Sequence, residues 1–130
     1  MSRSKTRTIL VFGPQGDWAA VRSILGQSRF KVVRVSSVDE VEELAPAASA
    51  IICDLQGAQG RGWKTVLEAA REKKPWITFI VSSYRADDRL LVEVVDAGGY
   101  CVTKKPFCKK ELSGLFGEAG TKTINASCFV

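Results

Sequence analysis

The sequence contains no histidine, and its four cysteines include no CxxC pair. The common zinc sites that combine cysteine with histidine are therefore excluded. Hydrophobic runs are short: the longest fall far below the ~20 apolar residues that cross a bilayer, and the N-terminus lacks the apolar block of a signal peptide. We expect a cytoplasmic protein whose cysteines stay reduced and serve mainly in packing, without contact to a membrane.

The length and composition of the chain are typical of one ordinary globular domain. The chain has 130 residues, of which 45% are hydrophobic and 25% are charged, and its net charge is +5. The clusters of lysine and arginine lie in three separate places, and no basic stripe is interleaved with aromatic residues. We therefore expect a basic surface that steers acidic partners weakly, and no direct binding of nucleic acid by this domain.

Strand-like and helix-like segments alternate along the chain. Asp17 is placed to cap the first helix and Gly26 to end it, while Ser36 or Ser37 can cap the second helix. Such alternation predicts a parallel sheet that is covered by helices on both faces, with right-handed crossovers. The expected strands are 8–12, 30–37, 49–55, 76–83 and 100–103, and the expected helices are 18–25, 38–45, 63–74, 89–99 and 108–120.

The expected strands end on residues that can carry chemistry. In parallel sheets the functional crevice lies beyond the carboxyl ends of the strands, so these residues should meet there. A strand-end carboxylate can act as a nucleophile, a cation can offset its charge, and a hydroxyl can hold transferred oxygens. The strand ends are Gly13-Pro14, Asp54, Ser82-Ser83 and Lys105-Pro106.

This constellation resembles the receiver (CheY-like) domain of two-component response regulators, over roughly residues 6–117. The segments IICDL, VSSY and KKPF carry the resemblance, together with AGG at 97–99 and Gly62-Trp63. The resemblance implies an α/β flavodoxin-like fold: a doubly wound, five-stranded parallel sheet in the order 2-1-3-4-5, with about five helices. Residues 118–130 would then form a C-terminal tail, or a linker to an output domain.

The resemblance also implies roles for the strand-end residues. Asp54 stands where the family has the aspartate that accepts a phosphoryl group from a histidine kinase or phosphotransfer protein. Lys105, with Lys104 as its neighbour, stands where the family has the lysine that pairs with that aspartate, and the peptide Lys105-Pro106 is cis in many receivers. Either Ser82 or Ser83 would contact the phosphoryl group, and the sequence leaves both open; a capping role in the turn that follows is an equal alternative.

The departures from the family concern the metal. In the family two adjacent acids at the end of the first strand hold Mg²⁺, and here these positions are Gly13 and Pro14. We assign Asp17 to the helix cap, which leaves the Asp54 carboxylate and the Gln56 carbonyl, too few anionic ligands for a hard cation. We therefore expect no cofactor and doubt Mg²⁺ binding, so that phosphorylation of Asp54 should be impaired.

Two further positions depart from the family. Val102 replaces the aromatic residue that switches conformation after phosphorylation, and Ala58 replaces the usual proline of the loop after Asp54. The most consistent function is an atypical, non-enzymatic receiver for signal transduction. It would act on a partner or output domain, or on a second copy, through the fourth helix, fifth strand and fifth helix.

Two alternative functions stay open. The first is an interaction module that works without phosphorylation, its conformation set by protein binding or a small ligand. The second is a nucleotide-binding α/β enzyme, which the turn GPQG at 13–16 favours only weakly, since it lacks the third glycine of a dinucleotide motif. The enzyme hypothesis is also weakened because the sequence has no histidine and no second acid near Asp54 to support acid–base catalysis.

Cys53, Cys101 and Cys108 could lie near one another at one end of the sheet. For buried cysteines, a packing role is more common than redox sensing.

Overall fold

Strands and helices alternate along the whole described chain. The computed structural model describes residues 6–26, 30–57 and 62–116. The strands are β1 (Arg7–Phe12), β2 (Phe30–Val35), β3 (Ala50–Asp54), β4 (Thr78–Ser83) and β5 (Cys101–Lys104). The helices are α1 (Gln15–Leu25), α2 (Val38–Leu44), the 3₁₀ turn η1 (Ala45–Ala47), α3 (Trp63–Lys73), α4 (Asp88–Asp96) and α5 (Lys109–Leu115). The five expected strands and five expected helices are confirmed, with ends that differ by a few residues.

The strands form one parallel sheet in the order β2-β1-β3-β4-β5. The central strand β3 pairs with β1 on one side and β4 on the other, with Asp54 beside Ser82 in the register. The chain runs outward from β1 to β2 and then crosses to β3, so the strand order reverses between β1 and β3. This confirms the predicted flavodoxin-like fold and places a crevice at the carboxyl ends of these two strands.

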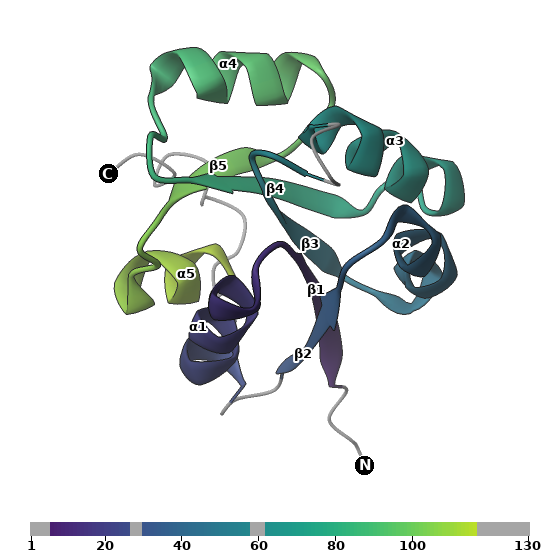
Figure 1. Ribbon diagram of the computed structural model, residues 1–130, viewed down its shortest axis with the longest axis horizontal. Helices are drawn as coiled ribbons and strands as arrows, with labels where there is room; N and C mark the ends of the chain where they lie inside the picture. The colour runs from purple at the N-terminus through teal and green to yellow at the C-terminus, as the bar shows by residue number, and fades with distance from the viewer. Residues whose placement is uncertain (1–5, 27–29, 58–61, 117–130) are drawn as a thin grey trace.

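Helices cover both faces of the sheet (Figure 1). Helices α1 and α5 lie on one face, while α2, α3 and α4 lie on the other. Because side chains alternate along a strand, neighbours such as Ile52 and Cys53 belong to different core clusters. The α1–α5 side is built around Ile9, Val11, Val21, Ile52, Ile80 and Leu112, and the other side around Leu10, Val41, Ile51, Val66, Phe79 and Val94.

The predicted helix ends are confirmed at two places and wrong at a third. Gly26 ends α1 by donating its backbone N–H to the Arg22 carbonyl, and the Ser37 hydroxyl accepts a hydrogen bond from the Glu40 N–H at the start of α2. Asp17, however, is not the cap of α1, because this helix begins two residues earlier, at Gln15. Its carboxylate is therefore available for another role.

The cysteines are dispersed. Cys53 and Cys101 are both buried, but in core clusters on opposite faces of the sheet, whereas Cys108 is exposed. Burial raises the pKa of the Cys53 thiol far above its ordinary value, which makes it an unreactive packing residue. Cys53 and Cys101 therefore pack on different sides of the sheet, in agreement with the packing role that the sequence favoured. Cys128 and the predicted tail 118–130 lie outside the described residues. Within the described part, no helix is long and apolar enough to cross a bilayer.

Candidate functional site

A cavity of about 720 Å³ opens at the carboxyl ends of the strands. It lies where the strand order reverses, which is the usual position of a binding site in an open α/β sheet. Its lining combines the end of β1, the start of the β3–α3 loop, the end of β4 and the residue that follows β5. The lining residues are Phe12, Gly13, Pro14, Ser36, Asp54, Leu55, Gln56, Gly57, Ser83, Tyr84, Arg85 and Lys105.

The charged centre of the site consists of one ammonium group and two carboxylates. Lys105 Nζ lies 2.6 Å from Asp54 Oδ1 and 2.9 Å from Asp17 Oδ2. The side chain of Lys105 is only 5% exposed, and those of Asp17 and Asp54 are 11% and 15% exposed. Three separate elements thus contribute to one buried ion network, which we call the Asp17–Lys105–Asp54 triad. The predicted contact between Lys105 and Asp54 is confirmed by the distance between their side chains.

Asp17 lies in this site, although the sequence predicted it as a helix cap. The first turn of α1 follows directly on the end of β1, so a residue there faces the carboxyl edge of the sheet. The expectation of a single carboxylate near Asp54 is therefore wrong, and so is the statement that Asp54 has no second acid beside it. The negative charge that is missing at Gly13 and Pro14 is supplied instead from the helix.

Gly13 makes the approach of Asp17 possible. A Cβ atom at position 13 would lie 3.1 Å from Asp17 Oδ2 and 3.1 Å from the Asp54 Cβ. Such contacts are tighter than ordinary van der Waals contacts, so a larger residue would crowd the Asp17 carboxylate and the Asp54 side chain. Gly13, directly after β1, and Asp17, in α1, therefore belong to the same arrangement.

The loop after β3 engages the remaining polar atoms of Asp54 and Gln56. The Gln56 N–H donates a hydrogen bond to Asp54 Oδ2 at 3.0 Å, and the Gly57 N–H donates to the Asp54 carbonyl. The Gln56 carbonyl, which the sequence offered as a cation ligand, accepts a hydrogen bond from the Gly62 N–H at 3.0 Å. Both carboxylate oxygens of Asp54 and the Gln56 carbonyl thus have partners from the chain itself.

The two serines at the end of β4 have different surroundings. Ser83 lines the cavity, and its hydroxyl accepts a hydrogen bond from the Arg85 N–H at 3.0 Å. Ser82 is 1% exposed, and its hydroxyl donates to the Cys53 carbonyl at 3.4 Å. Ser83 is therefore the serine that can meet a group bound in the cavity, and it also supports the turn after β4. Lys104 is exposed, whereas Lys105 is buried.

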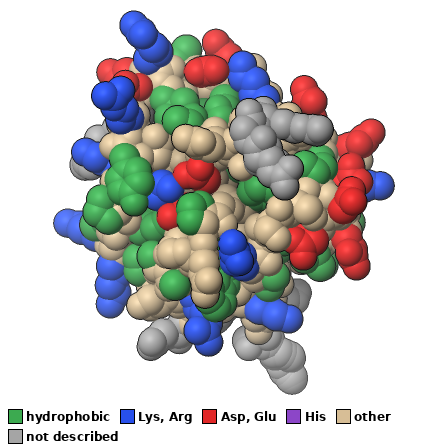
Figure 2. Space-filling model, viewed as in Figure 1, with side chains coloured by type: hydrophobic (Ala, Val, Ile, Leu, Met, Phe, Trp, Pro, Cys, Tyr) green, Lys and Arg blue, Asp and Glu red, His purple; other side chains and the backbone are tan. Residues whose placement is uncertain are grey.

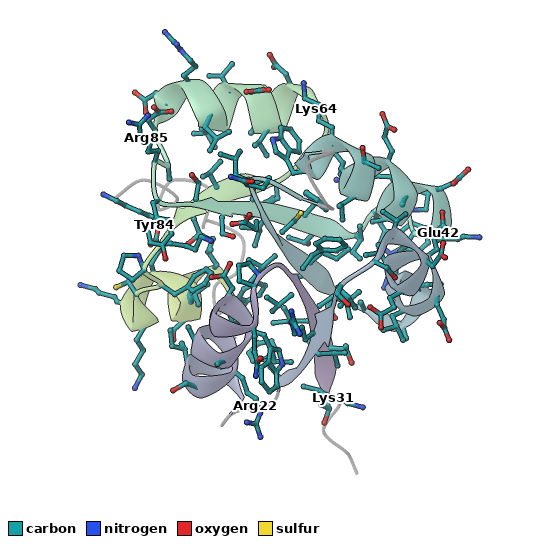
Figure 3. The ribbon with its side chains drawn as sticks, in the orientation of Figure 1. Arg22, Lys31, Glu42, Lys64, Tyr84 and Arg85 are labelled. Atoms are coloured by element: carbon teal, nitrogen blue, oxygen red, sulfur yellow. The ribbon has the colours of Figure 1, made fainter. Side chains whose placement is uncertain are left out.

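Tyr84 and Arg85 border the cavity, although the sequence assigned them no role. Lys105 Nζ lies 5.0 Å from the centre of the Tyr84 ring, within cation–π range, although Tyr84 is 67% exposed. Both residues follow β4 and lie on the same side of the molecule, far from Glu42 on α2 (Figure 3). Val102, by contrast, is completely buried in the core. The aromatic group beside Lys105 is therefore that of Tyr84, directly after β4, and not a side chain of β5. The run VSSY was the available signal, since the aromatic follows the site serine directly.

The triad changes the acid–base behaviour of Lys105. Burial acts to lower the pKa of its ammonium group, but the hydrogen bonds and negative charges of Asp54 and Asp17 outweigh burial, so the pKa is raised above 10.5. A raised pKa in the folded state means that the ammonium stabilises the fold fully below the unfolded-state pKa.

The stabilisation by Lys105 should therefore be lost only in strong alkali. We expect the free energy of unfolding to fall as the pH rises above about 10.5, through the raised pKa of Lys105. Urea denaturation of the protein and of the Lys105→Met variant at a series of pH values tests this. The protein should lose more stability than the variant between neutral and strongly alkaline pH; equal losses would contradict the assigned contribution of Lys105.

The comparisons with known proteins agree with this geometry at the level of the fold. No protein-family model matches the sequence, and no curated protein matches it. Solved structures do match. The signal receiver domain of an HD domain-containing protein from Pseudomonas fluorescens superposes with a TM-score of 0.74 at 16% identity, over 98% of this chain and 93% of that one. The fold is that of response-regulator receiver domains.

Two further receiver domains superpose over most of their length. A CheY-like receiver domain protein from Methanospirillum hungatei gives a TM-score of 0.72 at 18% identity, covering 88% of this chain and 93% of that one. The beryllofluoride-activated receiver domain dimer of NtrC4 gives 0.73 at 17% identity, covering 86% and 94%. At such identities the likeness establishes the receiver fold, and the site must be interpreted from its own residues. The cis peptide Lys105-Pro106, which the resemblance implied, is present.

The residues of the site do not fit the Mg²⁺ ion that the receiver fold implies. A hard cation needs several oxygen ligands that are free to turn toward it. Asp17 and Asp54 provide carboxylates, but one ammonium group contacts an oxygen of each, and the Gln56 carbonyl is held by Gly62. No cluster of three or more potential metal ligands among aspartate, glutamate, cysteine and histidine occurs in the described residues.

Proposed function

We propose that this chain is a signal-transduction receiver domain of the response-regulator type, in which Mg²⁺-dependent phosphorylation of Asp54 is impaired. The observation that carries the proposal is the Asp17–Lys105–Asp54 triad at the carboxyl end of a receiver-type sheet. In this proposal Asp54 is the phosphoacceptor and Lys105 is its counter-ion. The remaining charge at the site comes from Asp17, which is bound to the same lysine.

Phosphoryl transfer depends on positive charge that stabilises the transferring group. Here the Lys105 ammonium is shared between two carboxylates, so part of its charge is neutralised before any phosphoryl donor arrives. A phosphoryl group on Asp54 would add negative charge close to Asp17. Phosphorylation of Asp54 is therefore opposed by the same residues that stabilise the resting site.

The labelling prediction follows from this charge balance. We expect acetyl phosphate with Mg²⁺ to label the protein weakly or not at all, as measured by intact mass. The Asp54→Asn variant is the control, because it keeps the shape of the side chain but removes the nucleophile. Stoichiometric labelling that disappears in Asp54→Asn would show an active phosphoacceptor and overturn the proposal.

The proposed output surface is the face formed by α4, β5 and α5. Val92 and Val95 on α4 are 58% and 49% exposed, and β5 is an edge strand of the sheet. Acidic side chains gather over α2, whereas acidic and basic side chains are mixed over α4, which carries Asp88, Glu93 and Asp96 beside Arg89 (Figure 2). A protein partner or attached output domain would cover the exposed valines of α4 with an apolar surface of its own. A histidine kinase or phosphotransfer protein would instead approach the cavity. A second copy of this chain is an alternative occupant of the same face, since the NtrC4 neighbour is a dimer.

A second candidate is an interaction module that works without any phosphorylation. The closed triad favours it, because the site already holds a counter-charge on both carboxylates. Binding of a partner by the Asp54→Asn variant distinguishes the two candidates once a partner is known. Unchanged binding supports the module, and lost binding supports regulation through Asp54. An acid–base enzyme fits less well, because both carboxylates of the centre are paired with Lys105.

A further inference from the structure

The feature that goes furthest beyond the proposed function is the position of the Lys105 ammonium between two carboxylates. Its Nζ contacts Asp17 Oδ2 at 2.9 Å and Asp54 Oδ1 at 2.6 Å, and its side chain is 5% exposed. The carboxylates come from α1 and β3, which are held together by the paired strands β1 and β3. A positive charge is thus fixed at the point where these two elements bring their negative charges together.

A divalent cation between Asp17 and Asp54 would have to share the same two carboxylates with the ammonium group. Metal ions such as Mg²⁺ and Mn²⁺ bind carboxylates by direct contact with oxygen, and two carboxylates that share one partner would share the metal. The ammonium and the metal would then lie within a few ångströms of each other, where like charges repel strongly. Only one of the two cations can occupy this position at a time.

We infer that Lys105 is a built-in cation, which takes the place of a divalent metal between Asp17 and Asp54. Gly13 belongs to this arrangement, since a side chain there would crowd the Asp17 carboxylate and the Asp54 side chain. The inference deepens the proposed function and rests on it for its biological meaning. It concerns cation binding alone, however, so it can be measured with no phosphoryl donor present and can fail independently.

The first experiment removes the ammonium group and asks whether a metal site appears. The Lys105→Met variant keeps most of the length of the side chain but leaves Asp17 and Asp54 without their cation. Binding of Mn²⁺ is measured by electron paramagnetic resonance of the free ion, with Mg²⁺ as competitor. We expect the unmodified protein to bind Mn²⁺ negligibly and the variant to bind it with an affinity higher by about tenfold or more.

Two further variants show whether the new site is the predicted one. The Asp17→Asn substitution in the Lys105→Met background should abolish the gain, because it removes one of the two carboxylates. Lys104→Met removes an exposed lysine next to Lys105 in the chain, and it should behave like the unmodified protein. A gain in Lys104→Met would show a general charge effect and would overturn the inference, as would a gain that survives Asp17→Asn.

A measurement on the unmodified protein decides the question if Lys105→Met does not fold. Backbone amide resonances of Gly13, Asp17 and Gln56 are followed by NMR during titration with Mg²⁺ and, separately, with NaCl at equal ionic strength. The inference predicts the same small shifts with both salts. Saturable shifts of these amides with Mg²⁺ alone would overturn it, as would a folded Lys105→Met variant without any gain in Mn²⁺ affinity.

Discussion

Replacing Lys105 with methionine should lower the free energy of unfolding by about 3 kcal/mol at neutral pH, the cost of leaving one side of a buried ion pair without its partner. Asp17 and Asp54 would then face each other at low exposure without a counter-charge, although Asp54 would keep its hydrogen bond from the Gln56 N–H. Urea denaturation followed by circular dichroism measures the change. This is the largest effect that we expect from a single polar side chain of the protein.

The control for this experiment is Lys104→Met, which removes an equal charge from an exposed position. Surface substitutions of this kind change stability by about 0.5 kcal/mol or less. Adding Asp17→Asn to Lys105→Met should recover part of the loss, because it removes the repulsion between the two carboxylates. A loss below about 1 kcal/mol in Lys105→Met would mean that the triad contributes little to the fold.

Replacing Gly57 with alanine should cost about 2 kcal/mol or more, because backbone and not side chain fills the space around it. Gly57 has φ 62°, a conformation that residues with a Cβ rarely adopt. A Cβ there would collide with the Gly62 carbonyl and lie 2.7 Å from the Trp63 nitrogen. The Gly57 N–H also donates to the Asp54 carbonyl, so the loop beside the site would have to move.

Thermal denaturation of Gly57→Ala tests this prediction, and Gly114→Ala is the matched control. Gly114 lies in α5, and a Cβ there would meet nothing within 4 Å. Alanine in that helix should stabilise the protein by about 0.5–1 kcal/mol. If both substitutions change stability by the same amount and in the same direction, the close contact between Gly57 and Gly62 does not shape the loop.

The fold could be predicted because its signals are local. Runs such as Ile9 to Phe12 and Ile51 to Cys53 are apolar throughout, which is typical of strands buried on both faces. Helix caps such as Ser37 depend on neighbouring residues only. The strand order 2-1-3-4-5, by contrast, came from the resemblance of IICDL and KKPF to receiver domains and not from periodicity.

The site could be predicted only in part, because its charge balance depends on contacts between distant residues. Asp54 and Lys105 stood at strand ends, where chemistry is expected. Asp17 and Lys105 are 88 residues apart in sequence, and an acid at the start of a helix is more commonly a cap than a residue that turns toward the sheet. The available signal was the combination of Gly13, which leaves space, with an acid in the turn that follows.

The most direct test of this account is a crystal structure of the protein grown with millimolar Mg²⁺. Any bound cation and the position of the Lys105 side chain would both be visible in the electron density. The account predicts that Lys105 Nζ stays within hydrogen-bond distance of Asp17 and Asp54, with no metal between them. An octahedral Mg²⁺ bound to the two carboxylates, with Lys105 displaced, would contradict it.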